Sequence, residues 1–183
     1  MSTLEGIREA LPGYARDLQL NLGTVLTPAG APGLSERQIW AVALAAAASS
    51  RNPAFSLRFQ ALAARHLDAA HVSAAHAAAA IMAMNNVYYR FRHMIGKPSY
   101  DAKPARLRMQ RIAKPATNKP DFELFCLAVS AINGCEMCIR SHEDVVLKGA
   151  VSEEQVHDAV RIAATISAAA LALDLPVPAA AVV

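Results

Sequence analysis

Charged and aromatic residues are both scarce in this sequence of 183 residues, at 18% and 5% of the chain. Aromatic and β-branched residues are too sparse to build many strands. Apolar residues make up 54% of the chain, enough to bury a core, which excludes wholesale disorder. Forty residues are alanine, the best helix former. We therefore predict an all-α, compact helical domain over residues 1–175, followed by a frayed tail over 176–183.

A secretory signal and a long apolar run are also missing. The N-terminal residues mix acidic and basic charges, where a signal peptide needs an apolar run. An uncharged stretch, residues 73–89, is rich in alanine, whereas a membrane-spanning helix needs about 20 strongly apolar residues. The net charge of +3 comes without a recognisable nucleic-acid-binding module. The one dense basic stretch, residues 103–119, is broken by proline and is interpreted as a solvated connector. We expect a cytoplasmic protein without a membrane or nucleic-acid partner.

Helix start and stop signals predict three helices in the first half of the chain, over residues 35–50, 52–66 and 73–95. A capping box opens the first helix, and an Asn–Pro pair opens the second. Ser73 is expected to cap the long third helix, which Gly96 ends.

Three further helices are predicted in the second half, over residues 118–132, 135–149 and 152–173. An Asn–Gly pair separates the first two, and a second capping box opens the third. The two halves resemble each other at an offset of 85 residues, at which Trp40 and Ser50 match Phe125 and Cys135. Alanine-rich helices resemble one another by default, so two related helical halves are an open interpretation.

The chain has three cysteines, an odd number that makes a poor framework of structural disulfides. Cys135 and Cys138 form a CxxC at the predicted start of a helix. Two thiols in this spacing can form a disulfide without unwinding the helix. Free N–H groups and the partial positive charge of a helix start also favour a thiolate. In a reducing compartment, this pattern indicates redox or metal chemistry.

Two other side chains are placed to assist these thiols. His142 follows Cys138 by four residues, on the same helical face, and is a candidate proton shuttle for it. Glu123 lies twelve residues before Cys135, on the preceding helix. If the two helices pack as a hairpin, the carboxylate approaches the thiols and can accept a proton from His142, or from a thiol through water.

Other interpretations of these residues stay open. A zinc site would use Cys135, Cys138 and His142 with Cys126 as a fourth ligand, but structural zinc usually draws on two ligand pairs. The two thiols could also meet by chance in a packed core. Cys126, on an apolar helix, is more simply a buried small hydrophobic residue than a third redox partner.

A pair of asparagines, Asn85 and Asn86, interrupts the apolar face of the long helix predicted over residues 73–95. Buried amides need hydrogen-bond partners. They therefore indicate either packing between helices or subunits, or a channel that leads to the thiols.

At these residues the sequence resembles the alkylhydroperoxidase D family, within the carboxymuconolactone decarboxylase-like superfamily. The similarity covers nearly the whole chain and is carried by residues 11–17, 80–90 and 122–143. It implies an all-helical homotrimer that acts as an antioxidant thiol peroxidase on organic hydroperoxides. It also implies that the protein reduces a partner peroxiredoxin of the alkyl hydroperoxide reductase system. Electrons would come from a dihydrolipoyl group on a dehydrogenase-complex subunit, with no bound cofactor or metal.

The resemblance also implies a role for each site residue. Cys138 would be the peroxidatic thiol that becomes a sulfenic acid, and Cys135 the resolving thiol and proton donor that closes the Cys135–Cys138 disulfide. Glu123 and His142 would form the proton relay. Some family members carry a histidine between the two cysteines, where this chain has Met137. A thioether cannot shuttle protons, so that position has no relay role here.

Two other functions are kept as alternatives. One is a thiol–disulfide oxidoreductase that does not act on peroxides, and the other is a helical metal-binding or interaction module without catalysis. The superfamily also includes a lactone decarboxylase, but that activity needs no redox dithiol, so the CxxC argues against it.

Overall fold

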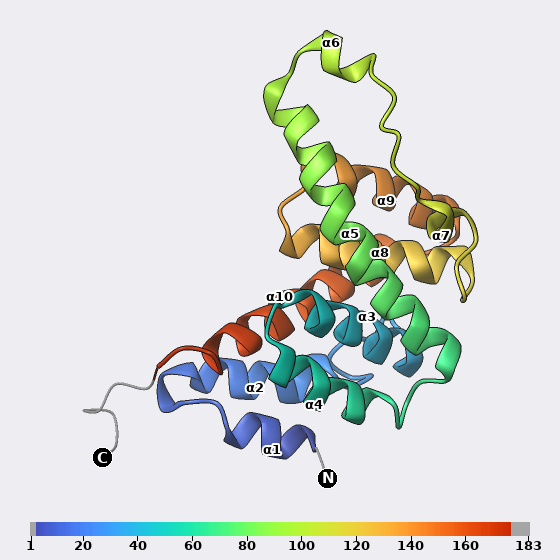
Figure 1. The fold of residues 1–183 in the computed structure, drawn as a ribbon. Coiled ribbons are helices and arrows are strands. Elements are labelled where there is room, and N and C mark those ends of the chain that lie inside the picture. Colours follow the sequence, from blue (N-terminus) through green and yellow to red (C-terminus); the bar gives the residue numbers. More distant parts are fainter. Residues whose placement is uncertain (1–2, 177–183) are drawn as a thin grey trace.

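The computed structural model describes residues 3–176, and its regular elements over that range are all helices, which confirms the predicted all-α class (Figure 1). The frayed tail expected over 176–183 lies outside the described residues, apart from its first residue. The elements in chain order are α1 (Leu4–Glu9), the 3₁₀ helix η1 (Gly13–Ala15), α2 (Arg16–Val25), α3 (Glu36–Ser49), α4 (Pro53–Ala63), α5 (Ala69–Ile95), α6 (Pro98–Asp101), α7 (Gln110–Ala113), α8 (Lys119–Ile132), α9 (Glu136–Lys148) and α10 (Glu153–Ala172).

Two helices, α3 and α8, form the centre of the core and pack against each other. Residues 39–47 of α3 and 122–130 of α8 are all buried, because these segments are apolar on nearly every side. Five alanines of α3 are completely buried. Small side chains let α3 approach α4, α5 and α10 closely, and α8 in turn contacts α5, α9 and α10.

Most predicted helix starts are confirmed. Ser35 and Ser152 each form a complete capping box, and Asn52 and Asn118 each cap a helix whose first turn contains proline. One start was wrong: α5 begins four residues before Ser73.

The physical reason for the earlier start of α5 is an acceptable cap upstream of Ser73. Asp68 accepts a hydrogen bond from the backbone N–H of His71 at 2.9 Å, and the alanines that follow propagate the helix. The expected extent of α4 was also wrong, because α4 ends at Ala63 and leaves His66 in the following turn.

Two successive sets of three helices have the same order and spacing. Helices α8, α9 and α10 begin 83, 83 and 84 residues after α3, α4 and α5 begin. The offset of 85 residues inferred from the sequence was therefore wrong by one or two residues. The cap of α9, Cys135, corresponds to the cap of α4, Asn52. This arrangement supports two related helical halves.

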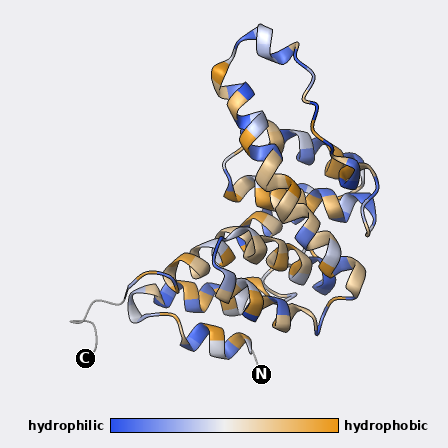
Figure 2. Cartoon of the chain, in the orientation of Figure 1, coloured by the Kyte–Doolittle hydropathy of each residue, from blue (hydrophilic) through white to orange (hydrophobic). Residues whose placement is uncertain are grey.

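The C-terminal end of α5 and the short α6 project from the body, and a connector then returns the chain to α7 beside α8 (Figure 1). Hydrophilic residues predominate along this connector and around α7 (Figure 2). Gly96 ends α5 in the left-handed region, at φ 58°, as the sequence predicts. No helix among residues 3–176 combines the length and the apolarity that crossing a membrane requires.

Candidate active site

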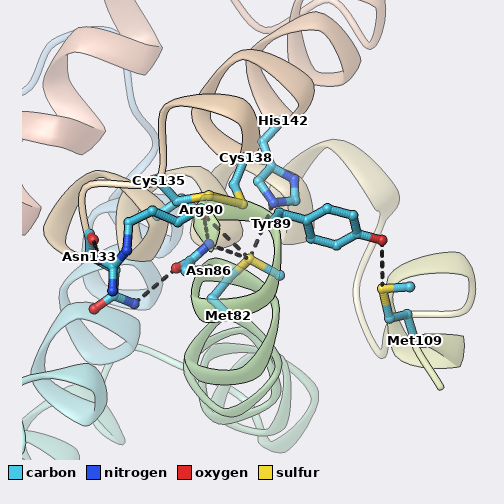
Figure 3. Close-up of a disulfide and its surroundings, with 10 residues drawn as sticks. Met82, Asn86, Tyr89, Arg90, Met109, Asn133, Cys135, Cys138 and His142 are labelled. Carbon is cyan, nitrogen blue, oxygen red and sulfur yellow. Dashed lines mark hydrogen bonds between the residues drawn. A yellow bond between two sulfur atoms is a disulfide. The ribbon is translucent and has the colours of Figure 1, made fainter. Parts of the chain in front are cut away.

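The two cysteines of the CxxC form a disulfide at the start of α9 (Figure 3). Cys135 is the N-cap of α9, and Cys138 lies in its first turn, so their Cα atoms are 5.3 Å apart. The turn before them is fixed by Gly134, at φ 64°, and by a hydrogen bond from the Cys135 N–H to the Ser130 carbonyl at 3.1 Å. The short turn folds α8 and α9 into the hairpin that the sequence predicts.

This hairpin brings Glu123 and His142 together. The His142 Nδ1 lies 2.5 Å from the Glu123 Oε2, and both side chains are buried. The other carboxylate oxygen, Oε1, accepts a hydrogen bond from the Lys119 ammonium at 2.7 Å. Burial, the largest single influence, raises the pKa of Glu123, but the bonds from His142 and Lys119 together outweigh it and lower the pKa below its ordinary value of 4.5. Glu123 is therefore a carboxylate at neutral pH.

The second nitrogen of His142 faces a thioether. Its Nε2 lies 3.2 Å from the Sδ of Met82, which comes from α5. A thioether sulfur can only accept a hydrogen bond, so Met82 is an acceptor for Nε2 whenever that nitrogen carries a proton. In this disulfide form, no hydrogen bond joins His142 to either cysteine sulfur among residues 3–176. The structure thus brings all four predicted site residues to one hairpin without a hydrogen bond between the imidazole and either cysteine.

A polar network fastens the α8–α9 turn to α5. Asn86 accepts from the Asn133 amide at 2.9 Å (Figure 3). It also donates to the Ser130 hydroxyl at 2.9 Å. The Arg90 guanidinium donates to the Asn133 carbonyl. Asn86 is therefore a packing residue between helices, one of the two roles that the sequence left open.

A pocket of about 390 Å³ opens beside the disulfide, between α5, α7, α8 and α9. Cys138 lines it and Cys135 does not. Cys135 is completely buried, and Cys138 retains 5% exposure. A reactant that enters this pocket therefore meets Cys138 first.

The wall of the pocket includes two residues that sequence reasoning missed, Met109 and Ile112. Met109 and Ile112 come from the connector and α7, and Tyr89 comes from α5, with its hydroxyl 3.8 Å from the Met109 sulfur. Met137, between the two cysteines, adds a further thioether to the wall. For Met109 and Ile112, the only signal in the sequence was that apolar residues occur within the basic stretch of residues 103–119.

Cys126 remains a free, buried thiol on α8. Burial raises its pKa well above the ordinary value of 9.0, and the Glu123 carboxylate adds to this rise. A protonated, buried thiol is a poor nucleophile. Over residues 3–176, no group of three or more His, Cys, Asp or Glu side chains is arranged to hold a metal ion.

The fold and the pocket define an all-helical protein with a CxxC disulfide centre. The model of the carboxymuconolactone decarboxylase family matches residues 98–175 of this chain. A relative from Anaeromyxobacter dehalogenans strain 2CP-C is 61% identical over 96% of this chain and 92% of its own. Relatives from Solibacter usitatus and Streptomyces griseus are 49% and 45% identical, over 94% and 93% of this chain and 96% and 95% of their own. All three are named alkyl hydroperoxide reductase AhpD. The chain therefore belongs to the alkylhydroperoxidase D family, within the carboxymuconolactone decarboxylase-like superfamily.

Proposed function

We propose that this protein is a thiol peroxidase that reduces organic hydroperoxides through Cys135 and Cys138, with electrons from dihydrolipoyl groups. The observation that carries the proposal is the placement of the disulfide, with Cys138 facing a largely apolar pocket and a buried Glu123–His142 pair in the same wall. The names of the relatives support the peroxide chemistry.

In the oxidative half of the cycle, the Cys138 thiolate attacks the terminal oxygen of the hydroperoxide. The O–O bond breaks, the new S–O bond makes a sulfenic acid, and the departing alkoxide takes a proton and leaves as an alcohol. The Cys135 thiol then condenses with the sulfenic acid and releases water. Glu123 and His142 accept and return protons during these steps.

In the reductive half, a dihydrolipoyl thiolate enters the same pocket and attacks Cys138, the sulfur on the pocket side. A mixed disulfide forms and Cys135 leaves as a thiolate at the N-terminus of α9, where free N–H groups stabilise negative charge. The second lipoyl thiol then releases the reduced protein and oxidised lipoyl. The same dithiol also serves the proposed reduction of a partner peroxiredoxin. A reducing cytoplasmic location suits such a cycling pair.

The proposed homotrimer has a candidate contact surface at the projecting end of α5. Phe91, Met94 and Ile95 there, and Tyr100 on α6, are exposed apolar side chains. Exposed apolar patches of this kind mark surfaces that another chain covers.

The proposed lipoyl partner has a candidate docking surface on the segment that forms one wall of the pocket. The connector and α7, which supply Met109 and Ile112 to the pocket wall, also carry the exposed side chains of Arg108, Arg111 and Lys114. The Lys119 ammonium donates to the Ile112 carbonyl at 3.1 Å and ties this segment to α8. Because lipoyl domains are often acidic, these cations are placed to guide one toward Cys138.

Charge reversal tests this docking surface. In the double variant Arg108→Glu, Arg111→Glu we expect turnover with a lipoyl domain to fall about tenfold at low salt and the loss to shrink at high salt. Arg106 is left unchanged because its backbone is left-handed, at φ 54°. Lys148→Glu, exposed at the far end of α9, is the matched control. An equal loss with free dihydrolipoamide would remove the docking surface from the proposal.

Mass spectrometry of the reduced protein after one equivalent of cumene hydroperoxide tests the proposed function itself. We expect a Cys135–Cys138 disulfide, one equivalent of alcohol, and Cys126 still a free thiol. A crosslink to Cys126 would overturn the site assignment. Thiols that exchange with dithiols but ignore peroxide would favour the non-peroxidatic oxidoreductase, and stoichiometric zinc with thiols inert to peroxide would favour the metal-binding module.

A further inference from the structure

Asn85 places a buried, unpaired acceptor in the pocket that contains Cys138. Its side chain comes from α5, is 4% exposed and lines the pocket one turn before Tyr89. The amide oxygen Oδ1 is buried and has no hydrogen-bond partner among residues 3–176. A buried acceptor without a donor costs free energy that an apolar side chain of the same shape avoids. This position therefore holds a polar group whose partner is not part of the described chain.

Asn85 differs from its neighbour Asn86, whose side chain is used in packing between helices. The amide nitrogen of Asn86 donates to Ser130 and its amide oxygen accepts from Asn133, and these two bonds join α5 to the α8–α9 turn. Asn85 takes no part in that network and lines the pocket with Cys138. The two adjacent amides thus have different environments, one satisfied by packing and one open to a ligand.

We propose that Asn85 is a substrate-positioning residue whose Oδ1 accepts the O–H hydrogen of an organic hydroperoxide and holds its terminal oxygen beside Cys138. This inference rests on the proposed function. Met109, Ile112 and Val145 in the same pocket are apolar and suit the carbon body of the substrate. An alkyl or aryl hydroperoxide has both features, because it is an apolar molecule with a hydrogen-bond donor at one end.

The proposed hydrogen bond is useful because the hydrogen stays on the terminal oxygen throughout the reaction. Cys138 supplies the electron pair of the new S–O bond, and the pair of the broken O–O bond leaves on the alkoxide, which takes a proton from His142 or solvent. The product sulfenic acid keeps the original O–H. A bond from this O–H to Asn85 therefore persists from bound substrate to product and aligns the O–O bond with the sulfur. A dithiol offers only S–H groups, which are weak donors, so Asn85 has little effect on reduction of the disulfide.

The test compares Asn85→Leu with Asn86→Leu and with the unaltered protein, in both half-reactions and in urea unfolding. For Asn85→Leu we expect the second-order rate constant for oxidation of the reduced thiols by cumene hydroperoxide to fall about tenfold, the effect of one lost hydrogen bond. Reduction of the disulfide by dihydrolipoamide should stay within about twofold, and the unfolding midpoint should stay equal or rise, because an unsatisfied acceptor is removed. Asn86→Leu, which breaks a satisfied network, should lower the unfolding midpoint.

Each outcome bears on one hypothesis. An Asn85→Leu variant that reacts with peroxide as fast as the unaltered protein overturns the assignment of Asn85. A variant that loses stability, or slows equally in both half-reactions, shows a structural role and also overturns it. If the unaltered protein exchanges with dithiols but does not react with the peroxide, the proposed function fails first.

Discussion

The substitution Cys138→Ser is expected to abolish peroxide-dependent oxidation of dihydrolipoamide, with a loss on the order of 10³-fold or more. Serine fits the space of the thiol, but its hydroxyl is not a nucleophile without a strong base and cannot form a disulfide. Peroxide consumption with dihydrolipoamide as the reductant measures the loss. The matched control is Cys126→Ala, which removes the buried thiol of α8 and should leave turnover nearly unchanged.

Trapping the sulfenic acid separates the roles of the two cysteines. Cys135→Ser retains the thiol that lines the pocket but lacks its resolving partner, so one equivalent of peroxide should leave a persistent sulfenic acid at Cys138. Cys138→Ser should form none. A stable sulfenic acid at Cys135 in the Cys138→Ser variant would show that Cys135 is the peroxidatic thiol and Cys138 the resolving one.

Local signals made most of this fold predictable from the sequence. Ser35, Asn52, Asn118 and Ser152 each cap a helix where their side chains and the following residues indicate it. These signals are reliable because a cap acts within three or four residues of the chain. The start of α5 was missed because Asp68 and Ser73 are both acceptable caps, and only the packed helix decides between them.

The hairpin of the site was equally predictable, whereas the pocket was anticipated only as one of two open roles for Asn85 and Asn86. Glu123 and His142 meet because a single Asn–Gly turn joins their helices. The pocket wall joins residues from helices far apart in the chain, such as Asn85 on α5 and Ile112 on α7. Pairing of that kind depends on tertiary packing, which periodicity and capping do not encode.

The two helical halves show how the chemistry is confined to one of them. At the offset of 83 residues, Glu123, Cys138 and His142 correspond to Trp40, Phe55 and Phe59. These three aromatic side chains pack together, with ring centroids of Trp40 and Phe55 lying 6.0 and 5.7 Å from that of Phe59. The carboxylate, thiol and imidazole of the second half are therefore replaced by three aromatic rings at the corresponding positions of the first half.

The substitution Glu123→Gln should lower peroxide turnover by about 10²- to 10⁴-fold, the usual contribution of a positioned acid–base group. Glutamine keeps the shape and can still accept a hydrogen bond from the His142 Nδ1. It cannot hold the negative charge that stabilises a protonated imidazole, so proton transfer to and from the thiols slows. Asp144→Asn, which removes an exposed carboxylate from α9, is the matched control and should leave turnover unchanged.

The same substitution should reduce the free energy of unfolding at pH 7 by about 2 kcal/mol, because a buried charged hydrogen bond is lost. Its pH dependence follows from the lowered pKa of Glu123, since folding then favours the carboxylate. The stability that this group contributes is complete above its ordinary value of 4.5 and is lost as pH falls through the lower pKa of the folded state. Urea unfolding should therefore show a constant gap between the unaltered protein and Glu123→Gln from neutral pH down to about pH 5, and a narrowing gap below about pH 4.5. A gap that widens on acidification would mean instead that folding raises the pKa of Glu123.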